Sequence, residues 1–429
     1  MRILIHGINF SPELTGIGKY TGEMAEWLAA QGHEVRVVTA PPYYPQWKVA
    51  EGYANGWRKE QRPIPPGPLL KKRGEPSPRG REGMVVYRCP LWVPVRPSGL
   101  KRVLNLASFA LSSFPVMLRQ VFWRPDMVLV VEPPLFCAPQ TWLVARLSGA
   151  GAWLHVQDFE VDAAFDLGIL QAAWLKRWVL FAERCLIRRF DRVSTISAKM
   201  LEKLENKGVK AERAILFPNW VDLDAIRPME EASEFRARLG ILPHQVVALY
   251  SGNMGEKQGL EIILEAAAKL QGSANIRFVL CGDGAAKPRL LKEYENLPNV
   301  AWLPLQPVDK LNELLNMADI HLLPQRADAA DLVMPSKLTG MLASGKPVVA
   351  TAYPDTQLGE VVSIGGRVVM PGAVDELVQA LSGLADDAGA RARLGRAGRA
   401  YAEENLSRDV ILSRFEIELL RCVDDSRHR

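Results

Sequence analysis

Short, nearly uninterrupted apolar runs alternate along this chain with longer segments in which apolar residues recur every three or four positions. Residues 2–7 (RILIHG) and 34–40 (EVRVVTA) are strand-like runs, and residues 20–33 between them (YTGEMAEWLAAQGH) have a helical pattern. Apolar strands separated by amphipathic helices indicate a parallel sheet that is covered on both faces. Further strand-like runs are MVVYRC, DMVLVVEPP, AWLHVQD, RVSTIS and AILFPN in the first half, and VVALYSG, IRFVLCGDG, VAWLP, DIHLLP and KPVVATA in the second. The pattern therefore predicts an α/β protein with two doubly wound, Rossmann-like domains.

The length and the position of turn-forming residues suggest where these domains begin and end. A chain of 429 residues fits two domains of roughly 150 to 200 residues each. We place the seam near PNWVDLDAIRP and predict an N-terminal domain at 1–218 and a C-terminal domain at 229–405. A last helix within 406–429 is expected to pack back on the N-terminal domain. Residues 61–80 contain six Pro and three Gly, which predicts an insertion loop.

Composition narrows the setting in which the protein works. The five cysteines are odd in number and show no CxxC or other metal-ligand spacing, which favours a reducing cytoplasm and predicts no metal site. The opening residues, MRILIHGINF, read as a strand and a turn rather than a signal peptide. No apolar run reaches the roughly 20 residues that are needed to span a bilayer. We therefore expect a cytoplasmic protein.

Positive charge is concentrated in one part of the chain. Residues 56–125 contain 14 Lys or Arg against three Glu, a local net charge of +11, whereas the whole chain carries +5. The basic residues flank apolar stretches rather than exposed stacking aromatics, which argues against nucleic acid as a partner. The segment 95–125 fits an anionic membrane surface, and the alternative is a buried helix with solvated basic ends.

Glycine-rich turns follow several predicted strands, at the edge where open α/β sheets bind ligands. After the first strand, Gly16 and Gly18 precede a helix and would let backbone N–H groups approach a phosphate or a sugar hydroxyl. Their spacing is GxGxxxG, so a dinucleotide fold and a dehydrogenase are poorly supported. The alternative is a tight turn without a ligand.

Two further turns lie in the second half. Gly252 and Gly255 make a turn after a strand, and a helix is expected to begin around residues 257–259, so that a diphosphate could contact the turn and Lys257. A solvated lysine is the alternative. The triplet Gly282, Asp283 and Gly284 ends the next strand and fits a nucleobase pocket lined by main chain, or only a turn.

Two other positions carry candidate chemistry. Asp158 follows a strand in the first half and could accept a proton or hold a sugar hydroxyl, or else cap a turn. His155, three residues earlier, is interpreted as a hydrogen-bonded core histidine. In DLVMPSKLTGMLASGKPVVATA a helix is expected to begin at Pro335 or Ser336, with Lys337 in its first turn, and its free N–H groups would favour an anion.

Together these loops resemble the retaining nucleotide-sugar glycosyltransferases of family 4, which have the GT-B fold. The resemblance rests on TGIGKYTGEMAEWLAAQGHEVRVVT, VQDFEVDAAFDLG, VSTISAKMLEKLENKGVKAERAILFPNWVD, YSGNMGEKQGLEIILEAA, CGDG and MPSKLTGMLASGKPVVATA, which span nearly the whole chain. The stretches HGINFSPELTGIGKYTGEM and TAPPYYPQWKV resemble the members that act in colanic acid biosynthesis.

The resemblance implies a substrate class and a site. The donor would be a UDP- or GDP-linked sugar, with GDP-fucose as one candidate, and transfer would retain the anomeric configuration without a cofactor or an obligatory metal. The acceptor would be a lipid-linked saccharide at the inner face of the cytoplasmic membrane. Asp158 and Lys257 are the catalytic candidates. The donor-binding candidates are Gly16, Gly18, Asn253, Lys257, Gly282, Asp283, Gly284, Met334, Pro335, Ser336, Lys337 and Leu338.

One departure from the family pattern leaves an alternative open. Family members commonly carry two Glu eight positions apart, and the second accepts hydrogen bonds from the ribose. The matching positions here are Leu332 and Gly340. A catalytically idle homologue that binds a nucleotide sugar or a partner enzyme is therefore the second hypothesis. A nucleotide-sugar epimerase would need a carboxylate and histidine set that the sequence does not offer.

Overall fold

The computed structural model describes residues 1–13, 16–63, 83–95, 98–159, 173–231, 233–273, 275–326 and 335–427, without the side chains of 173–176 and 257. The chain forms two compact units. Met1–Phe217 and Leu412–Arg429 make up the first, and Pro218–Ile411 the second. Among the described helices, none is both long and apolar enough to cross a bilayer.

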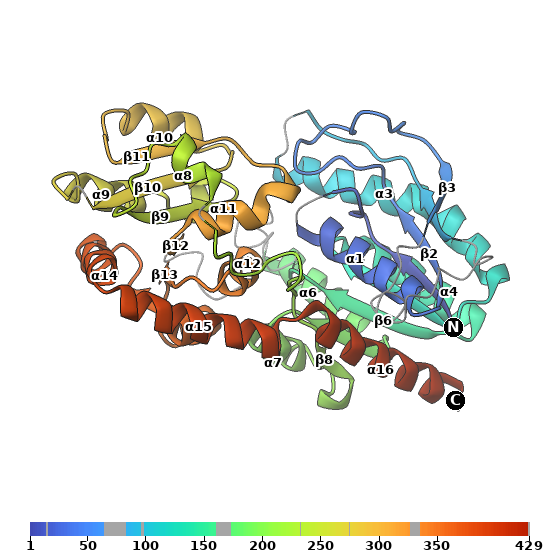
Figure 1. Ribbon diagram of the computed structural model, residues 1–429. Helices are drawn as coiled ribbons and strands as arrows, with labels where there is room; N and C mark the ends of the chain where they lie inside the picture. The colour runs from blue at the N-terminus through green and yellow to red at the C-terminus, as the bar shows by residue number, and fades with distance from the viewer. Residues whose placement is uncertain are drawn as a thin grey trace. The chain divides into compact units, whose positions relative to one another are not determined.

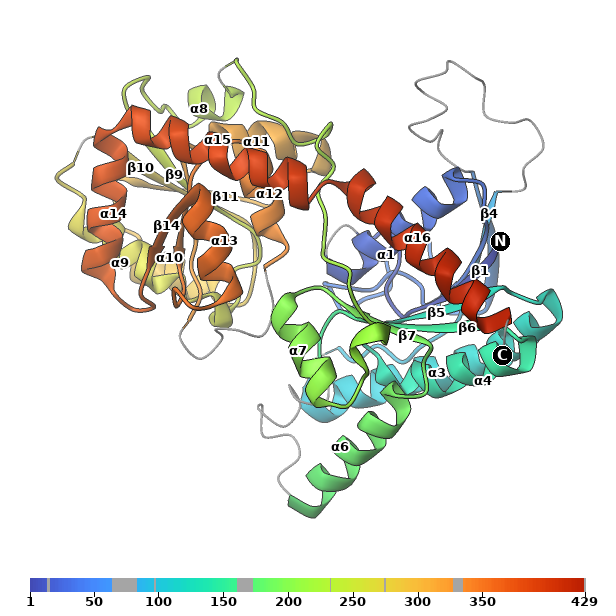
Figure 2. The same ribbon diagram turned by 90° about the horizontal axis from the view of Figure 1, so that it is seen from below.

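The first unit is built on an eight-stranded sheet in the order β3-β4-β2-β1-β5-β6-β7-β8, parallel except for β3. In Figure 2, α1 and α16 lie on one side of this sheet, and α3 and α4 on the other. The strands are β1 Arg2–His6, β2 Glu34–Thr39, β3 Arg58–Arg62, β4 Met84–Arg88, β5 Met127–Glu132, β6 Gly151–Val156, β7 Arg192–Thr195 and β8 Ala214–Leu216. The helices are α1 Gly16–Ala30, α3 Gly99–Gln120, α4 Ala138–Ser148, α6 Ala173–Ile187 and α7 Ala198–Asn206, together with the part of α16 (Arg408–Arg427) that follows Ile411.

The C-terminal helix α16 is held on the first unit by aromatic and charged contacts. The ring of Phe415 stacks on Phe217, with centroids 4.0 Å apart, and lies edge-on to Trp153 at 5.1 Å. On the same helix, the Glu416 carboxylate accepts a hydrogen bond from His33 Nε2 at 2.7 Å. These contacts hold α16, the C-terminal helix, against the sheet of the N-terminal unit.

The second unit has a six-stranded parallel sheet in the order β11-β10-β9-β12-β13-β14 (Figure 1). Alternate residues of β9 enter different clusters: Tyr250 packs with α9 and α14, and Leu249 packs with α8 and α11. The strands are β9 Val246–Ser251, β10 Ile276–Cys281, β11 Val300–Leu303, β12 Ile320–Leu323, β13 Val348–Thr351 and β14 Gly366–Val369. The helices are α8 Glu234–Arg238, α9 Glu261–Lys269, α10 Lys287–Glu293, α11 Leu311–Met317, α12 Lys337–Ala343, α13 Gln357–Gly365, α14 Val374–Asp386 and α15 Ala388–Asn405.

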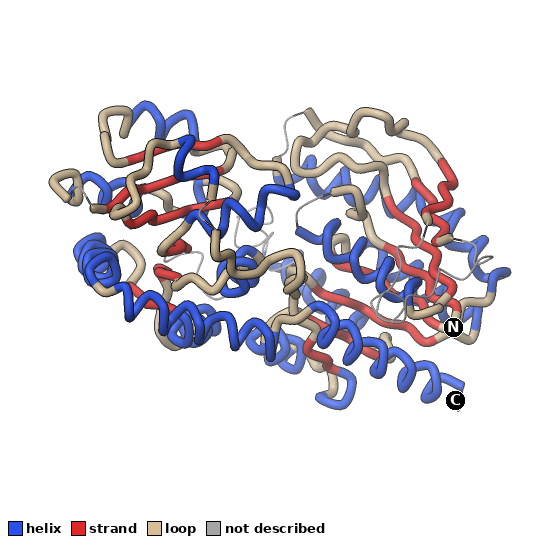
Figure 3. The backbone as a smooth tube through the Cα atoms, in the orientation of Figure 1, coloured by secondary structure: helices blue, strands red, loops and turns tan. Residues whose placement is uncertain are grey.

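The two sheets confirm the predicted α/β class, and three local expectations were wrong. Gly16 and Gly18 lie inside the first turn of α1 rather than before the helix. Helix α9 begins at Glu261 rather than around 257–259, because Gly259, at φ +63°, separates it from a short 3-10 turn at Glu256–Gln258. Residues 61 and 62 belong to the edge strand β3 and not to an insertion loop, whereas residues 64–80 lie outside the described part. Figure 3 shows β3 at the end of a long loop that follows β2.

Candidate functional site

The carboxyl ends of β9 and β10 carry two glycine turns that pack backbone against backbone. Gly252 has φ +140° and Gly282 has φ +150°, a region that side-chain-bearing residues rarely adopt. A Cβ atom on Gly282 would lie 1.9 Å from the carbonyl oxygen of Gly252, and one on Gly284 would lie 2.4 Å from that of Met254. The Met254 amide donates to the Asp283 carbonyl at 2.8 Å. Glycine is therefore required here for the close approach of the two turns.

Lys337 reaches the same turns from the start of α12. Its amine donates a hydrogen bond to the hydroxyl of Tyr250 at 3.1 Å and lies 4.3 Å from the centre of that ring. The Tyr250 hydroxyl in turn donates to the carbonyl of Asn253 at 2.5 Å. A Cβ atom on Gly252 would be 3.8 Å from the Lys337 amine. The structure thus brings Lys337 together with the turn that contains Gly252 and Asn253.

Burial changes the titration of this pair. Removal from water lowers the pKa of Lys337 to about 7, because the charged ammonium loses its hydration. The same cause raises the pKa of the Tyr250 hydroxyl, which stays protonated and available as a hydrogen-bond partner. Within the described residues no carboxylate forms an ion pair with Lys337, so an anion placed beside it would favour its charged form.

The remaining candidates of the second unit are placed as follows. Asn253 and Asp283 are exposed, and the Asp283 carboxylate accepts a hydrogen bond from the amide of Gly284 at 2.9 Å. Pro335 and Ser336 precede α12, where Ser336 is the N-cap residue but makes no side-chain capping bond, and Leu338 is buried. Met334 and Leu332 lie outside the described residues, as does the side chain of Lys257.

Three residues near these turns were missed at the level of sequence. Tyr250 reads only as a strand residue, and its contact with Lys337 joins segments 87 positions apart. The Lys287 amine donates to the carbonyl of Gly282 at 2.7 Å, and Arg326 lies so close to Gly259 that a Cβ there would be 2.8 Å from its Cγ. Lys287 and Arg326 could have been found from the sequence, because each is a cation shortly after a predicted strand, β10 or β12.

In the first unit, the loop after β1 is organised by a buried carboxylate. Glu13 accepts hydrogen bonds from the amides of Tyr43 and Tyr44 at 3.0 and 3.1 Å and from the Asn9 side chain at 2.8 Å. Desolvation raises the pKa of Glu13, and these hydrogen bonds oppose the rise. A Cβ atom on Gly18 would lie 2.6 Å from the Glu13 carboxylate, so Gly18 is needed for packing. Gly16, with φ +58°, has open space around its Cα instead.

Asp158 and His155 lie at the end of β6. Asp158 is exposed two positions beyond the strand. His155 is buried, with Nδ1 2.9 Å from the Ser194 hydroxyl and Nε2 2.9 Å from the Gln157 amide nitrogen, and burial lowers its pKa to about 3. The interpretation of His155 as a hydrogen-bonded core residue is confirmed.

Comparison with known families and proteins gives the same assignment for both units. The family described as "Glycosyl transferase 4-like domain" matches residues 15–220, and "Glycosyl transferases group 1" matches residues 245–387. The chain is 44% identical to the putative colanic acid biosynthesis glycosyl transferase WcaI of Escherichia coli (strain K12), over 97% of this chain and 98% of that protein.

Solved structures with the same fold have low sequence identity. Sucrose-phosphate synthase from Thermosynechococcus elongatus aligns over 99% of both chains with a TM-score of 0.74 and 16% identity. Anabaena Alr3699/HepE in complex with UDP-glucose aligns over 98% of this chain and 100% of its own, with a TM-score of 0.65 and 15% identity. With two matching domains and a full-length relative, this chain belongs to the glycosyltransferases that have the GT-B fold.

Proposed function

We propose that the protein transfers a sugar, with retention of anomeric configuration, from a UDP- or GDP-linked donor to a lipid-linked saccharide during assembly of a colanic acid-like exopolysaccharide. The polysaccharide class is proposed from the 44% identical relative, which is named for colanic acid biosynthesis. GDP-fucose is one candidate donor. The contact between Lys337 and the Gly252–Asn253 turn carries the proposal. It gathers a half-buried cation and a glycine turn at the carboxyl edge of the second sheet, where a donor diphosphate would bind.

The proposed chemistry needs charge stabilisation on the leaving group. Lys337 and Lys257 would stabilise the negative charge that develops on the departing nucleoside diphosphate. That diphosphate would itself take up the proton of the acceptor hydroxyl, and Asp158 would orient a substrate hydroxyl. This route uses no cofactor and no obligatory metal.

The setting at a membrane is supported by the outer side of α3. One side of this helix is buried through residues such as Phe109 and Met117, and its outer side is exposed. Leu104 and Leu111 are 51% and 77% exposed, and Phe122, just beyond the helix, is 89% exposed. Exposed basic residues accompany them at Lys101, Arg102, Arg119 and Arg124. Such a surface suits the anionic inner face of a cytoplasmic membrane.

A variant of Lys257 tests the catalytic assignment. Lys257→Ala should lower turnover at least about a hundredfold, the loss seen when one donor to a developing charge is removed, while the melting temperature stays unchanged. Lys292→Ala, an exposed lysine of α10, is the matched control and should keep wild-type turnover. Equal rates for the two variants would contradict the role of Lys257.

The alternative is an idle homologue that binds a nucleotide sugar or a partner enzyme, which Leu332 and Gly340 motivate. Thermal unfolding in the presence of UDP- and GDP-linked sugars identifies the ligand, because a bound ligand raises the melting temperature. Stabilisation by a nucleotide sugar without transfer to any lipid-linked acceptor would favour the idle homologue.

A further inference from the structure

The second unit contains a cavity that is separate from the candidate donor site. Its volume is about 570 Å³, and it is lined by the turn Gly345–Pro347, by Pro228, by Asp319 and by residues of α15. Asp319 directly precedes β12, and Pro347 directly precedes β13. The cavity therefore lies at the amino edge of the parallel sheet, whereas the glycine turns lie at the carboxyl edge.

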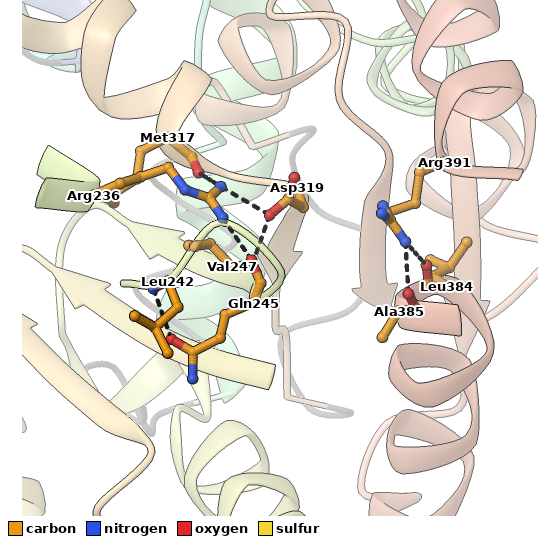
Figure 4. Close-up of polar contacts among 9 residues, drawn as sticks. All are labelled: Arg236, Leu242, Gln245, Val247, Met317, Asp319, Leu384, Ala385 and Arg391. Carbon is orange, nitrogen blue, oxygen red and sulfur yellow. Dashed lines mark hydrogen bonds and ion pairs between the residues drawn. The ribbon is translucent and has the colours of Figure 1, made fainter. Parts of the chain in front are cut away.

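Both carboxylates that line the cavity already have a cationic partner. Asp319 lies 3.0 Å from the Arg236 guanidinium and also accepts the Val247 amide at 2.8 Å (Figure 4). Glu403 pairs with Arg399 at 2.7 Å on the same helix. The negative charge of the lining is thus neutralised within the protein.

Three cations that line the cavity, in contrast, form no ion pair within the part of the chain that the structure describes. Lys346, Arg391 and Arg396 have no carboxylate partner among the residues that the structure describes. Among the described residues, the Arg391 guanidinium donates to carbonyl oxygens alone, those of Leu384 at 2.5 Å and Ala385 at 2.8 Å. Figure 4 shows these bonds on the opposite side of the view from Asp319. The cavity therefore has an uncompensated positive charge.

Tight packing holds the walls of the cavity in place. A Cβ atom on Gly395 would lie 2.0 Å from the carbonyl oxygen of Gly345, so α15 and the turn touch through their backbones. The Arg399 guanidinium donates to the carbonyls of Ala343 at 2.7 Å and Ile226 at 2.8 Å. The cavity is therefore formed before any ligand arrives, which reduces the cost of ordering on binding.

We propose that this cavity binds a small molecule that carries a phosphate or diphosphate group. Arginine and lysine are the side chains that bind phosphate oxygens most readily, and uncompensated cations in a concave site favour a multiply charged anion. The volume lies within the range of about 300 to 1,000 Å³ that is usual for small-molecule sites. Neither the catalytic proposal nor the membrane proposal uses these residues.

Calorimetric titration with inorganic pyrophosphate tests the site on the full-length protein. The double variant Lys346→Gln with Arg396→Gln removes two of the three cations without deleting a described hydrogen bond. It should weaken pyrophosphate binding at this site at least tenfold. The charge-matched control, Arg367→Gln with Arg393→Gln, changes exposed residues outside the lining and should bind as the wild type does.

The donor site must be separated from this cavity in the same experiment. Lys257→Ala should leave the pyrophosphate site that depends on Lys346 and Arg396 unchanged, since it lies at the other edge of the sheet. The proposal is overturned by wild-type protein that binds no pyrophosphate. It is also overturned if K346Q/R396Q binds as tightly as the wild type, or if the control loses affinity to the same extent.

Discussion

At the scale of single residues, the most informative contact is the one between Lys337 and Tyr250. The sequence predicts a cation at the start of α12, but not that it would be half-buried against an aromatic ring with a lowered pKa. The same holds for Glu13, whose three hydrogen bonds join two loops of the first unit. Tyr43, about 30 positions away, provides one of them, and periodicity along the chain cannot predict such a contact.

The titration of Lys337 predicts how diphosphate binding depends on pH. In the free protein the pKa of Lys337 is lowered to about 7, and a bound anion would raise it again. At a pH between the pKa of the free protein and that of the complex, binding of the diphosphate therefore takes up a proton. The affinity for UDP or GDP should therefore be steady below pH 7 and fall as pH rises above it, by up to about tenfold per pH unit.

Calorimetry from pH 6 to 9 measures this dependence. Lys337→Arg is the control, because arginine stays protonated over the whole range. The variant should lose the pH dependence that the wild type shows above pH 7. Identical profiles for the two proteins would show that Lys337 does not contact the diphosphate.

Gly340 allows the departure from the family pattern to be reversed. It lies in α12, and a Cβ there would meet only Leu315 Cδ1, at 3.4 Å. Gly340→Glu should place a ribose acceptor where the family resemblance implies one and strengthen nucleoside diphosphate binding about tenfold or more, the value of a charged hydrogen bond.

Gly340→Ala separates this effect from helix propensity. Alanine should stabilise α12 by roughly 0.5–1 kcal/mol, seen as a higher melting temperature, without changing affinity. Binding measurements on both variants decide the point. If the glutamate variant binds no better than the alanine variant, this chain holds its nucleotide differently from its relatives.

At the scale of elements, the sequence predicts the apolar strands well, including the edge strands β8 and β11, but it misses the edge strands β3 and β14. Strand β3, RKEQR, contains no apolar residue, because it pairs at the edge of the sheet through its backbone alone. Strand β14 has only four residues, and a Cβ atom on its first residue, Gly366, would lie 1.8 Å from the carbonyl oxygen of Val348. Both strands are defined by their neighbours in the sheet, so local pattern could not reveal them.

The helix α3 carries a prediction of its own. The variant with Lys101, Arg102, Arg119 and Arg124 all changed to Gln should bind phosphatidylglycerol-containing vesicles at least about tenfold less, since each charge near an anionic surface contributes about 1 kcal/mol. Sedimentation with vesicles measures the effect. Changing Arg238, Lys292, Arg367 and Arg393 to Gln removes the same charge from exposed positions of the second unit and serves as the control.

The apolar part of this surface gives an independent check on the same measurement. Leu104→Gln with Leu111→Gln should also weaken vesicle binding, because exposed leucines contribute by entering the interface. Wild-type binding by the charge variant, or equal losses in the variant and its control, would contradict the membrane proposal.

At the scale of the whole molecule, the order of motifs along the chain predicts the fold and the family better than it predicts the contacts within the site. The α/β class and the GT-B family were predicted from glycine turns and short motifs that recur in a fixed order, and the fold and the comparisons confirm both. The candidate site depends on far fewer residues than the fold does. Lys337 and the turns at Gly252 and Gly282 could be predicted from local sequence, whereas their partners depend on the packing of distant segments.

The central claim is that this protein transfers a sugar with retention. The most direct test incubates it with isotopically labelled UDP- and GDP-sugars, including GDP-fucose, and with lipid-linked saccharide acceptors, and determines the anomeric configuration of the product by NMR. We predict that one donor labels the acceptor and that the new linkage keeps the configuration of the donor. An inverted linkage would contradict this account, and so would the absence of transfer from a nucleotide sugar that the protein demonstrably binds.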